Sequence, residues 1–225
     1  MPPPKKHDRL PLLHEAGWQG GWLQPPPPTE SHAPRAITLK FGGSMLTRPT
    51  WPGLLRRLLN AFEMPVHIVC GGGAVVEGLR HYDAAVPQPP VRMHRLAIAG
   101  MALNARMVAE ELGLPLLQQL PPVDDRQDRG GLIDPTCWLD AGLFDHLPAS
   151  WSVTSDSLAA VVAHSFAEPL LLAKQCPPPA SVVPGSSGPH LYQQLAAAGW
   201  IDPHLAAVCS SVCSVAWAAP REDMA

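Results

Sequence analysis

The chain has 225 residues and a mass of 24.1 kDa, which is enough for one large domain or two small ones. Hydrophobic residues make up 46% of it and charged residues 16%, with a mean hydropathy of +0.03, so the composition excludes a disordered, collagen-like or acidic-tail protein. The net charge is −3, and the Lys and Arg residues are dispersed along the chain. We therefore expect a small-molecule substrate, and neither nucleic acid nor a membrane surface as a partner.

The sequence indicates an intracellular location. No stretch is long and apolar enough for a membrane-spanning helix, and the first residues lack the apolar run of a signal peptide. The five cysteines are odd in number and form no CxxC motif, so they indicate neither a disulfide framework nor a zinc site. We expect a cytoplasmic protein with no metal site of its own.

Proline sets residues 1–35 apart from the rest of the chain. Nine of the 28 prolines lie there, including the run from Pro25 to Pro28. Because proline fixes φ and removes a backbone donor, this stretch predicts a disordered, largely extended N-terminal extension. Trp18 and Trp22 could attach it to the body of the protein or to a partner. The folded domain is expected to span residues 36–220.

Strands and helices are predicted to alternate along this domain. The first part contains a strand at 36–41, a helix at 51–63, a strand at 65–70, helices at 74–81 and 93–112, a short strand at 116–123, a charged loop at 124–131 and a helix at 137–147. The second part contains a capped helix at 156–166, a strand at 169–174, a proline-rich linker at 177–189, a helix at 190–198 and a final helix or strand pair up to Pro220. This alternation predicts an α/β fold, a three-layer sandwich with a largely parallel central sheet.

Only two lysines, Lys40 and Lys174, lie outside the N-terminal extension. Each lies at the end of a predicted buried strand, so both ammonium groups are expected at the carboxyl ends of parallel strands, where open α/β sheets bind ligands. A lysine there can place its charge on a phosphate group. For either residue alone, a solvated lysine after a strand is an equally good interpretation, but two equivalent positions favour the functional one.

Two glycine-rich turns follow the first two predicted strands. They consist of Gly42, Gly43 and Ser44, and of Gly71, Gly72 and Gly73. Glycine has no Cβ, so such turns let backbone N–H groups approach a phosphate, and the second turn also precedes a helix N-terminus. The triplet matches neither GxGxxG nor GxxxxGK[ST], and a flexible turn explains it equally well. Arg80 and His94 follow on the next helices and could hold a second anionic group, although each alone is more typical of a surface residue.

Asp156 lies at the start of the helix predicted at 156–166. As a cap or first-turn acid it stabilises the helix, which is a sufficient structural explanation. The functional alternative is that its carboxylate orients Lys40 and Lys174 and keeps both protonated.

Four segments, taken in chain order, resemble motifs of the amino acid kinase superfamily, which includes acetylglutamate kinase, aspartokinase and uridylate kinase. Residues 37–44 resemble its opening K-x-G-G-S element, 68–73 its acceptor-binding glycine loop, 154–159 its D-[ST]-x-[AS] element and 170–174 the strand that enters its nucleotide-binding half. The resemblance implies an ATP-dependent kinase that transfers the γ-phosphoryl group to an anionic small molecule, with Mg²⁺ carried by the nucleotide. It also implies an acceptor-binding half at 36–168 and a shortened nucleotide-binding half at 169–220.

The same resemblance assigns roles to individual residues. It implies catalytic roles for Lys40, Asp156 and Lys174. It implies phosphate or substrate binding by Gly42, Gly43, Ser44, Gly71, Gly72, Gly73, Arg80, His94, Thr154 and Ser155. Members of the superfamily often dimerise, and the apolar helices of this sequence are compatible with a homodimer.

Within the superfamily, four local features are most similar to the small archaeal-type kinase of methanofuran biosynthesis, which extends aminomethylfuran methyl phosphate to its diphosphate. The features are Gly71 to Gly73 with Arg80 seven residues on, His94 with Ala97, Ile98 and Met101, the run Trp151 to Ser157, and the late run Gly199 to Asp202. This similarity implies that the acceptor is a phosphate monoester of C1-carrier cofactor metabolism, of the methanofuran or tetrahydromethanopterin type.

The sequence departs from the superfamily pattern after Lys174. Many members carry a second catalytic lysine downstream, where this chain has only His190, His204 and Arg221 as cationic candidates. The usual aspartate and glycine directly after the strand are also absent. The alternative is therefore a catalytically degenerate protein that keeps the kinase fold and binds a ligand or a partner.

Overall fold

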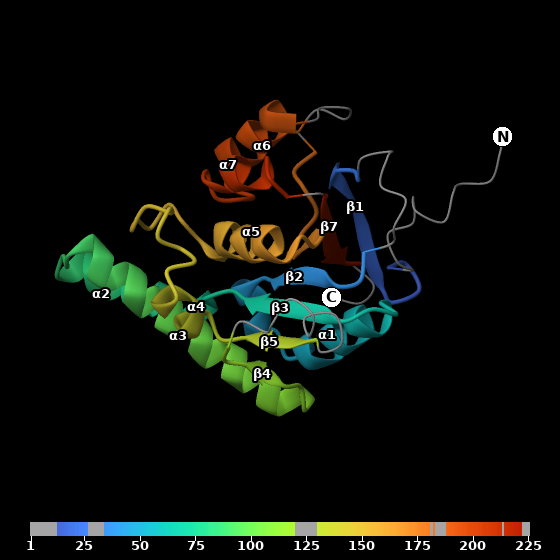
Figure 1. The fold of residues 1–225 in the computed structure, drawn as a ribbon, viewed down its shortest axis with the longest axis horizontal. Helices are drawn as coiled ribbons and strands as arrows, with labels where there is room; N and C mark the ends of the chain where they lie inside the picture. The colour runs from blue at the N-terminus through green and yellow to red at the C-terminus, as the bar shows by residue number, and fades with distance from the viewer. Residues whose placement is uncertain are drawn as a thin grey trace.

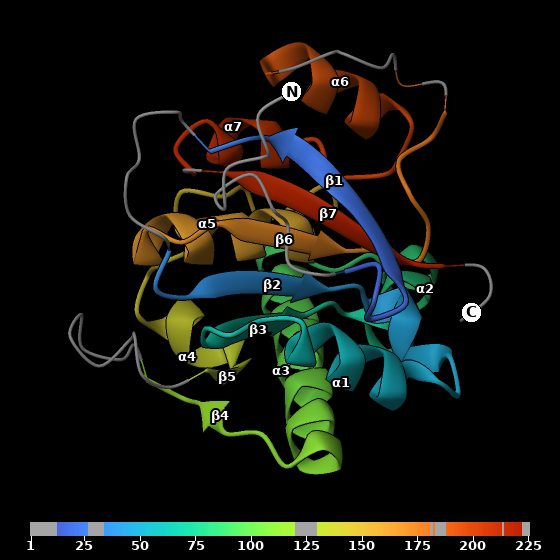
Figure 2. The same ribbon diagram turned by 90° about the vertical axis from the view of Figure 1, so that its right-hand side faces the viewer.

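Seven strands form one sheet in the part of the chain that the computed structural model describes, which comprises residues 13–26, 34–119, 130–180, 182, 188–212 and 214–221. The strand order is β1-β7-β6-β2-β3-β5-β4 (Figure 2). The bounds are Trp18–Gln24 for β1, Ile37–Phe41 for β2, Val66–Cys70 for β3, Leu116–Leu117 for β4, Gly131–Ile133 for β5, Leu170–Ala173 for β6 and Val215–Pro220 for β7. Neighbouring strands pair in parallel except β1, which is antiparallel to β7. The predicted, largely parallel sheet is confirmed.

Helices cover both faces of this sheet, which confirms the predicted three-layer α/β sandwich (Figure 1). Helices α1 and α3 lie on one side of the sheet, and α5, α6 and α7 lie on the other. The bounds are Trp51–Asn60 for α1, Gly73–Ala85 for α2, Pro90–Leu112 for α3, Pro135–Asp140 for α4, Ser155–Phe166 for α5, Gly188–Ala197 for α6 and Leu205–Cys209 for α7, with a 3-10 helix, η2, at Gly43–Thr47. None of the described helices has the length and apolarity needed to cross a membrane.

The central strands β2, β3 and β6 are buried along their whole length. Their apolar runs are typical of parallel strands that are covered on both faces. At the end of the strands opposite to Lys40, the Thr38 hydroxyl donates to Glu168 Oε2 at 2.6 Å, and His67 Nδ1 lies 2.8 Å from Glu168 Oε1. These buried contacts tie β2 and β3 to the residues that precede β6, and so help to fix the relative positions of the three strands.

Helix α5 is buried from Ser155 to Ala163 and ends in an unusual conformation. Its small side chains suit a helix that packs on both the sheet and α7. The residue after it, Ala167, has a φ of 54°, in the left-handed region that favours glycine.

Replacing Ala167 with glycine is expected to raise the free energy of unfolding by about 1 kcal/mol, because glycine adopts this conformation without a Cβ penalty. Gly113 provides a matched control. It ends α3 with a φ of 67°, and an added Cβ there would meet nothing within 4 Å, so Gly113→Ala is expected to lower stability by a similar amount. Urea denaturation measures both changes. An Ala167→Gly variant that is no more stable than the parent would contradict the left-handed conformation of Ala167.

The prediction that residues 1–35 form a disordered extension is wrong for residues 18–24. They form β1, which pairs with β7 over six residues of register, and Trp18 is fully buried with its indole N–H donating to the Leu54 carbonyl at 3.3 Å. The physical reason is that Trp18–Gln24 contains no proline and satisfies the open backbone groups at the edge of β7. Residues 1–12 and 27–33 lie outside the described residues.

Other boundaries also differ from the predictions. Strand β5 falls partly within the predicted loop at 124–131, because a strand of only three residues has too little periodicity to be seen in the sequence. The helix predicted at 137–147 is shorter and starts earlier, at Pro135, because Asp134 accepts a hydrogen bond from the Thr136 N–H and caps it. The strand predicted at 116–123 is seen only at Leu116–Leu117, and residues 120–129 lie outside the described part.

Candidate active site

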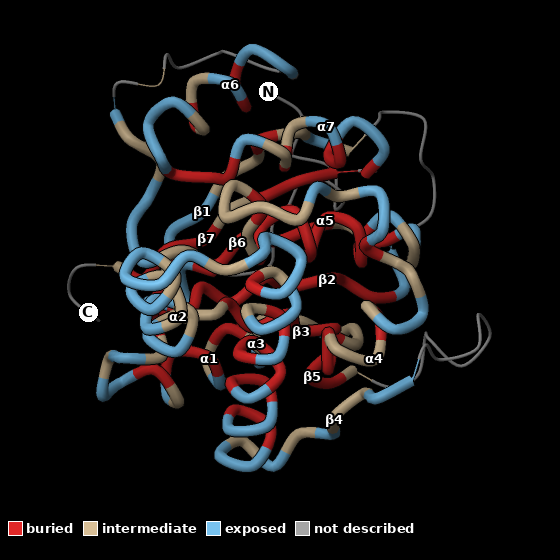
Figure 3. Tube along the Cα trace, turned by 90° about the vertical axis from the view of Figure 1, so that its left-hand side faces the viewer, coloured by how far each residue is buried: buried red, intermediate tan, exposed pale blue. Residues whose placement is uncertain are grey.

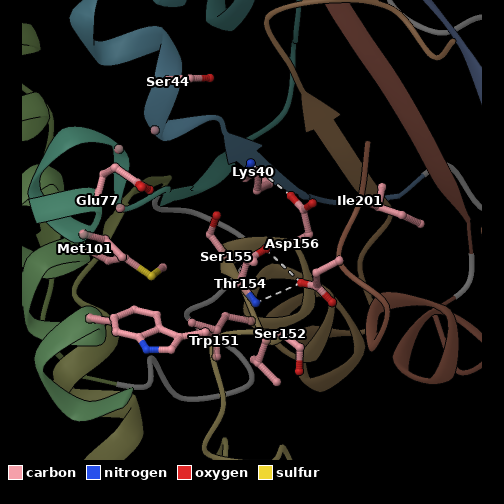
Figure 4. A pocket seen from close by; sticks show the side chains of 18 of the residues that line it. Lys40, Ser44, Glu77, Met101, Trp151, Ser152, Thr154, Ser155, Asp156 and Ile201 are labelled. Carbon is pink, nitrogen blue, oxygen red and sulfur yellow. Dashed lines mark hydrogen bonds and ion pairs between the residues drawn. The ribbon is translucent and has the colours of Figure 1, made fainter. Parts of the chain in front are cut away.

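The predicted site residues gather at the carboxyl ends of the central strands. Lys40 is on β2, the second glycine turn follows β3, Lys174 follows β6, and Asp156 is in the first turn of α5. All four segments contribute to one cavity of about 720 Å³ (Figure 4). This edge of the sheet is where open α/β folds bind ligands.

Asp156 bridges the two lysines. Its Oδ1 lies 2.9 Å from Lys40 Nζ, and its Oδ2 accepts a hydrogen bond from Lys174 Nζ at 2.5 Å. Figure 4 shows the Lys40 and Asp156 side chains meeting at one side of the cavity. The carboxylate is only 3% exposed, so two cations and one anion share a nearly dry environment with a net charge of +1. The arrangement that the sequence predicted for these three residues is present.

The pKa values of this cluster are shifted from their ordinary positions. Burial alone would raise the pKa of the Asp156 carboxyl, but the charges of Lys40 and Lys174 outweigh it and hold that pKa below its usual value. Burial, and then the charge of Lys40, lower the pKa of Lys174 to about 8, against the opposing effect of Asp156. Asp156 is therefore ionised at neutral pH, and Lys174 begins to lose its proton just above it.

The two glycine turns touch backbone to backbone. A Cβ added at Gly43 would lie 2.2 Å from the Gly73 nitrogen, and one added at Gly71 would lie 2.4 Å from the Gly43 nitrogen. Only glycine allows this approach, which also requires a φ of 50° at Gly73. The second turn is held from below by Asn104, whose Nδ2 donates to the carbonyls of Gly71 and Gly72 at 2.8 and 2.9 Å.

These turns supply only some of the predicted phosphate-binding groups. Gly43, Ser44, Gly72 and Gly73 line the cavity. The prediction that Gly42 and Gly71 also offer their amides is wrong, because both N–H groups already donate to the carbonyls of neighbouring strands, Gly42 to Ala173 at 3.0 Å and Gly71 to Phe41 at 2.8 Å. These two bonds continue the parallel ladder by one residue beyond the strands.

Thr154 and Ser155 both line the cavity, but the Thr154 hydroxyl already has two partners within the protein. It accepts from the Asp156 N–H at 3.2 Å, as the N-cap of α5, and donates to Asp202 Oδ2 at 2.8 Å. A cap that positions Asp156 is a structural role, and it differs from the substrate contact that the resemblance implied.

Asp202 is a buried residue to which the sequence assigned no role. Its carboxylate accepts hydrogen bonds from the backbone N–H and hydroxyl of Thr154 and of Ser157, and from the backbone N–H groups of His204 and Leu205. It therefore caps α5 and α7 together, and it fixes the segment in which the Trp200 carbonyl accepts from Lys174 Nζ at 2.7 Å. Only the tertiary structure reveals this role, because the donors on α5 are far from Asp202 in the chain.

Arg80 and His94 line the same cavity, on the side formed by α2 and α3. The Arg80 guanidinium lies over the Trp151 ring, 4.6 Å from its centroid, donates to the Trp151 carbonyl at 3.2 Å and lies 3.7 Å from Glu77. Burial lowers the pKa of the His94 imidazole, so this ring is largely neutral at pH 7. Arg80 is thus a cation held in place away from the Asp156 cluster. The Trp151 ring forms a wall of the cavity (Figure 4).

Within the described residues, no three His, Cys, Asp or Glu side chains come together in a way that could hold a metal ion. The lining of the cavity includes lysine, arginine and hydroxyl side chains and glycine backbone, which suit an anionic ligand.

Comparison with solved structures identifies the fold. The uridylate kinase of Archaeoglobus fulgidus superimposes with a TM-score of 0.58 and 16% identity over 84% of this chain and 93% of that one. The UMP kinase of Ureaplasma parvum gives a TM-score of 0.57 and 12% identity over 80% and 87% of the two chains. The chain shares the fold of these two kinases.

No protein-family model matches the sequence, and no curated protein matches it. The likeness therefore rests on the fold, and the structure neighbours are uridylate kinases.

Proposed function

We propose that this protein is a phosphotransferase that moves the γ-phosphoryl group of ATP to the phosphate of an anionic small molecule. The observation that carries the proposal is the bridge of Lys40 and Lys174 by one buried carboxylate, at the strand ends that line an open cavity. A structural ion pair needs one cation for one anion. The second lysine leaves a net positive charge, which suits a transferring phosphoryl group.

In this reaction an anionic oxygen of the acceptor phosphate attacks the γ-phosphorus, the bond to the bridging β-γ oxygen breaks, and ADP leaves. The attacking oxygen carries no proton, so the site needs no general base, and positioning with charge stabilisation is enough. We assign Lys40 and Lys174 to the charge on the transferring group and Asp156 to holding both ammonium groups in place. Gly43, Ser44, Gly72 and Gly73 line the cavity and are assigned to phosphate oxygens.

The nucleotide is assigned to the side of Lys174 and Trp200, in the half that spans 169–220. The Lys174 ammonium lies 5.1 Å from the Trp200 ring centroid and is held there by the Trp200 carbonyl. The donor set of lysines and amides fits a triphosphate, and Mg²⁺ would arrive bound to it and neutralise part of its charge. The acceptor is assigned to the other half, 36–168, where Arg80 could bind its far end.

The acceptor class is a phosphate monoester. The fold neighbours are named for UMP, and the sequence resemblance points to a phosphate monoester of C1-carrier metabolism. UMP and a C1-carrier monoester share the phosphate dianion and differ in the organic group attached to it. We assign that organic group to the cavity wall formed by Trp151, Met101 and Ile98.

A panel assay tests the proposal. The full chain is incubated with Mg²⁺-ATP and UMP, other nucleoside monophosphates, or small alkyl and furan- or pterin-bearing phosphate monoesters. We expect acceptor-dependent ADP release, with a diphosphate product detected by ³¹P NMR. ATP binding without ADP release for any acceptor would favour the catalytically degenerate alternative.

The activity is expected to fall as pH rises through about 8. The pKa of Lys174 is lowered to about 8, so above that pH the lysine becomes neutral and the site loses a charge on the transferring group. The effect of Lys174 on stability has the opposite sign. Its pKa is about 8 in the folded state and 10.5 ordinarily, so the folded state releases this proton at a lower pH than the unfolded state does. The free energy of unfolding therefore rises as the pH increases from about 8 to 10.5. A profile of kcat/KM against pH tests the first effect. A flat profile between pH 7 and pH 9 would show that the Lys174 charge is not used.

A further inference from the structure

Helix α3 carries one buried polar side chain, Asn104. Buried and exposed residues alternate along this helix, as in a helix that packs one side against a sheet (Figure 3). The buried residues of α3 are apolar or glycine with the exception of Asn104, which is 5% exposed. Because burying a polar group lowers stability unless the group is hydrogen-bonded, an amide at this position requires specific partners.

The partners of Asn104 are two consecutive peptide groups of the second glycine turn. Its Nδ2 donates to the carbonyl of Gly71 at 2.8 Å and to the carbonyl of Gly72 at 2.9 Å. Only the NH₂ end of the side chain can donate to two carbonyl oxygens, so an ionised aspartate of the same shape cannot replace it. Asn104 therefore holds both peptide groups in one orientation.

This contact also sets the direction of the next two backbone N–H groups. In a trans peptide the C=O of one residue and the N–H of the following residue point in opposite directions, and the described residues contain no cis peptide bond. Since the carbonyls of Gly71 and Gly72 point toward Asn104, the N–H groups of Gly72 and Gly73 point away from α3. Gly72 and Gly73 line the cavity, whereas Asn104 lies outside its lining.

Within the described part of the chain, neither the Gly72 N–H nor the Gly73 N–H has a backbone acceptor. The preceding N–H, that of Gly71, differs because it donates to the Phe41 carbonyl at 2.8 Å. Gly72 is the N-cap of α2 and Gly73 its first residue, so both N–H groups lie where a helix offers no partner of its own. Two adjacent donors with a common direction can therefore bind one anionic group.

We propose that Asn104 is a positioning residue that directs the N–H groups of Gly72 and Gly73 at the phosphate of the acceptor. The inference rests on the proposed function and assigns a separate task to this turn. Lys40 and Lys174 act on the transferring group, whereas the two N–H groups hold the acceptor phosphate in the half that spans 36–168. Hydrogen bonds to a charged phosphate oxygen are strong, so losing their direction should weaken acceptor binding and leave nucleotide binding unchanged.

Steady-state kinetics of Asn104→Asp, with the best acceptor of the panel, tests this role. We expect the KM for the acceptor to rise by about ten- to a hundredfold, because hydrogen bonds to a charged group are lost, while the KM for ATP stays the same. Asn104→Leu removes the donors without adding a charge and should give the same split. Equal rises in both KM values would show only a loosened fold and would overturn the proposal.

The matched control is Thr38→Val. It removes another buried hydrogen bond, from the Thr38 hydroxyl to Glu168 Oε2 at 2.6 Å, at the end of the strands away from the cavity. We expect this variant to be less stable than the parent in urea and to keep both KM values. If Thr38→Val raised the KM for the acceptor as much as Asn104→Leu does, the effect would belong to lost stability and the proposal would be wrong.

A second measurement does not depend on turnover. Selective ¹⁵N labelling of the 18 glycines of the full chain gives a simple NMR spectrum, and inorganic phosphate is the probe. We expect phosphate to shift the Gly72 and Gly73 amide signals in the parent, and to require about tenfold more phosphate in Asn104→Leu. Signals that do not move in the parent, or that move at the same phosphate concentration in the variant, would overturn the proposal. Shifts in the parent without ADP release in the panel assay would reject the kinase activity and uphold the role of Asn104 in anion binding.

Discussion

The Asp156→Asn variant is expected to lose about 3–5 kcal/mol of the free energy of unfolding, because the substitution leaves two nearly buried ammonium groups without a counter-charge. Asp156 is 3% exposed and contacts Lys40 at 2.9 Å and Lys174 at 2.5 Å, so both ammonium groups lose their nearest counter-charge. The asparagine keeps the size of the side chain, so the loss of stability measures the effect of the missing charge and not a change in packing. Urea denaturation at pH 7 measures it.

A second substitution distinguishes this explanation from a general loss of packing. If the penalty comes from like charges left together, then adding Lys174→Met to Asp156→Asn removes one of them and should recover part of the stability. The contrary result is simple additivity, in which Lys174→Met lowers the free energy of unfolding equally in the parent chain and in Asp156→Asn. The two positions would then not interact, and the explanation by charge would be wrong.

Replacing Lys40 with methionine is expected to lower kcat for phosphoryl transfer by about 10²–10³-fold, the typical loss when a preorganised charge on a transition state is removed. The fold should tolerate this change better than Asp156→Asn, since Asp156 keeps Lys174 as a partner and the methionine retains most of the apolar stem. Steady-state kinetics with the best acceptor of the panel measures the effect.

Arg80→Met serves as the control for this prediction. It also removes one cation from the cavity, but Arg80 lies over Trp151, away from the Asp156 cluster. We expect a higher KM for the acceptor with a smaller change in kcat, because a contact to the far end of the substrate stabilises the ground state and the transition state alike. Equal losses of kcat in both variants would mean that Lys40 has no special position in the reaction.

Local sequence patterns were sufficient to predict the central part of the fold. The apolar runs at β2, β3 and β6 are continuous because those strands are covered on both faces, and continuous runs flanked by glycine are readily recognised. β1 was missed because its stability comes from pairing with β7, at the other end of the chain, and its neighbouring prolines dominate the local composition. β5 has three residues, too few for a pattern.

The residues of the candidate site also fall into those that local sequence patterns predict and those that they do not. Lys40, Lys174 and Asp156 could be predicted because each has a fixed relation to the end of a strand or the start of a helix, and topology then brings these ends together. The Gly42 and Gly71 amides already have backbone partners, which the sequence could not reveal, because it does not show that the sheet ladder extends one residue past each strand. Asp202 and Asn104 act through tertiary hydrogen bonds to segments that are distant in the chain, for which the sequence offers no local pattern.

The most direct test of the central claim, that the Lys40-Asp156-Lys174 cluster is built to hold a transferring phosphate, is a thermal-shift titration of the full chain with Mg²⁺-ATP. A ligand at 100 times its Kd stabilises the folded state by about 2.7 kcal/mol, which gives a readily measured rise in Tm. We predict such a rise for the parent chain and its loss in Lys174→Ala. No shift at millimolar nucleotide, or an equal shift in Lys174→Ala, would contradict the account.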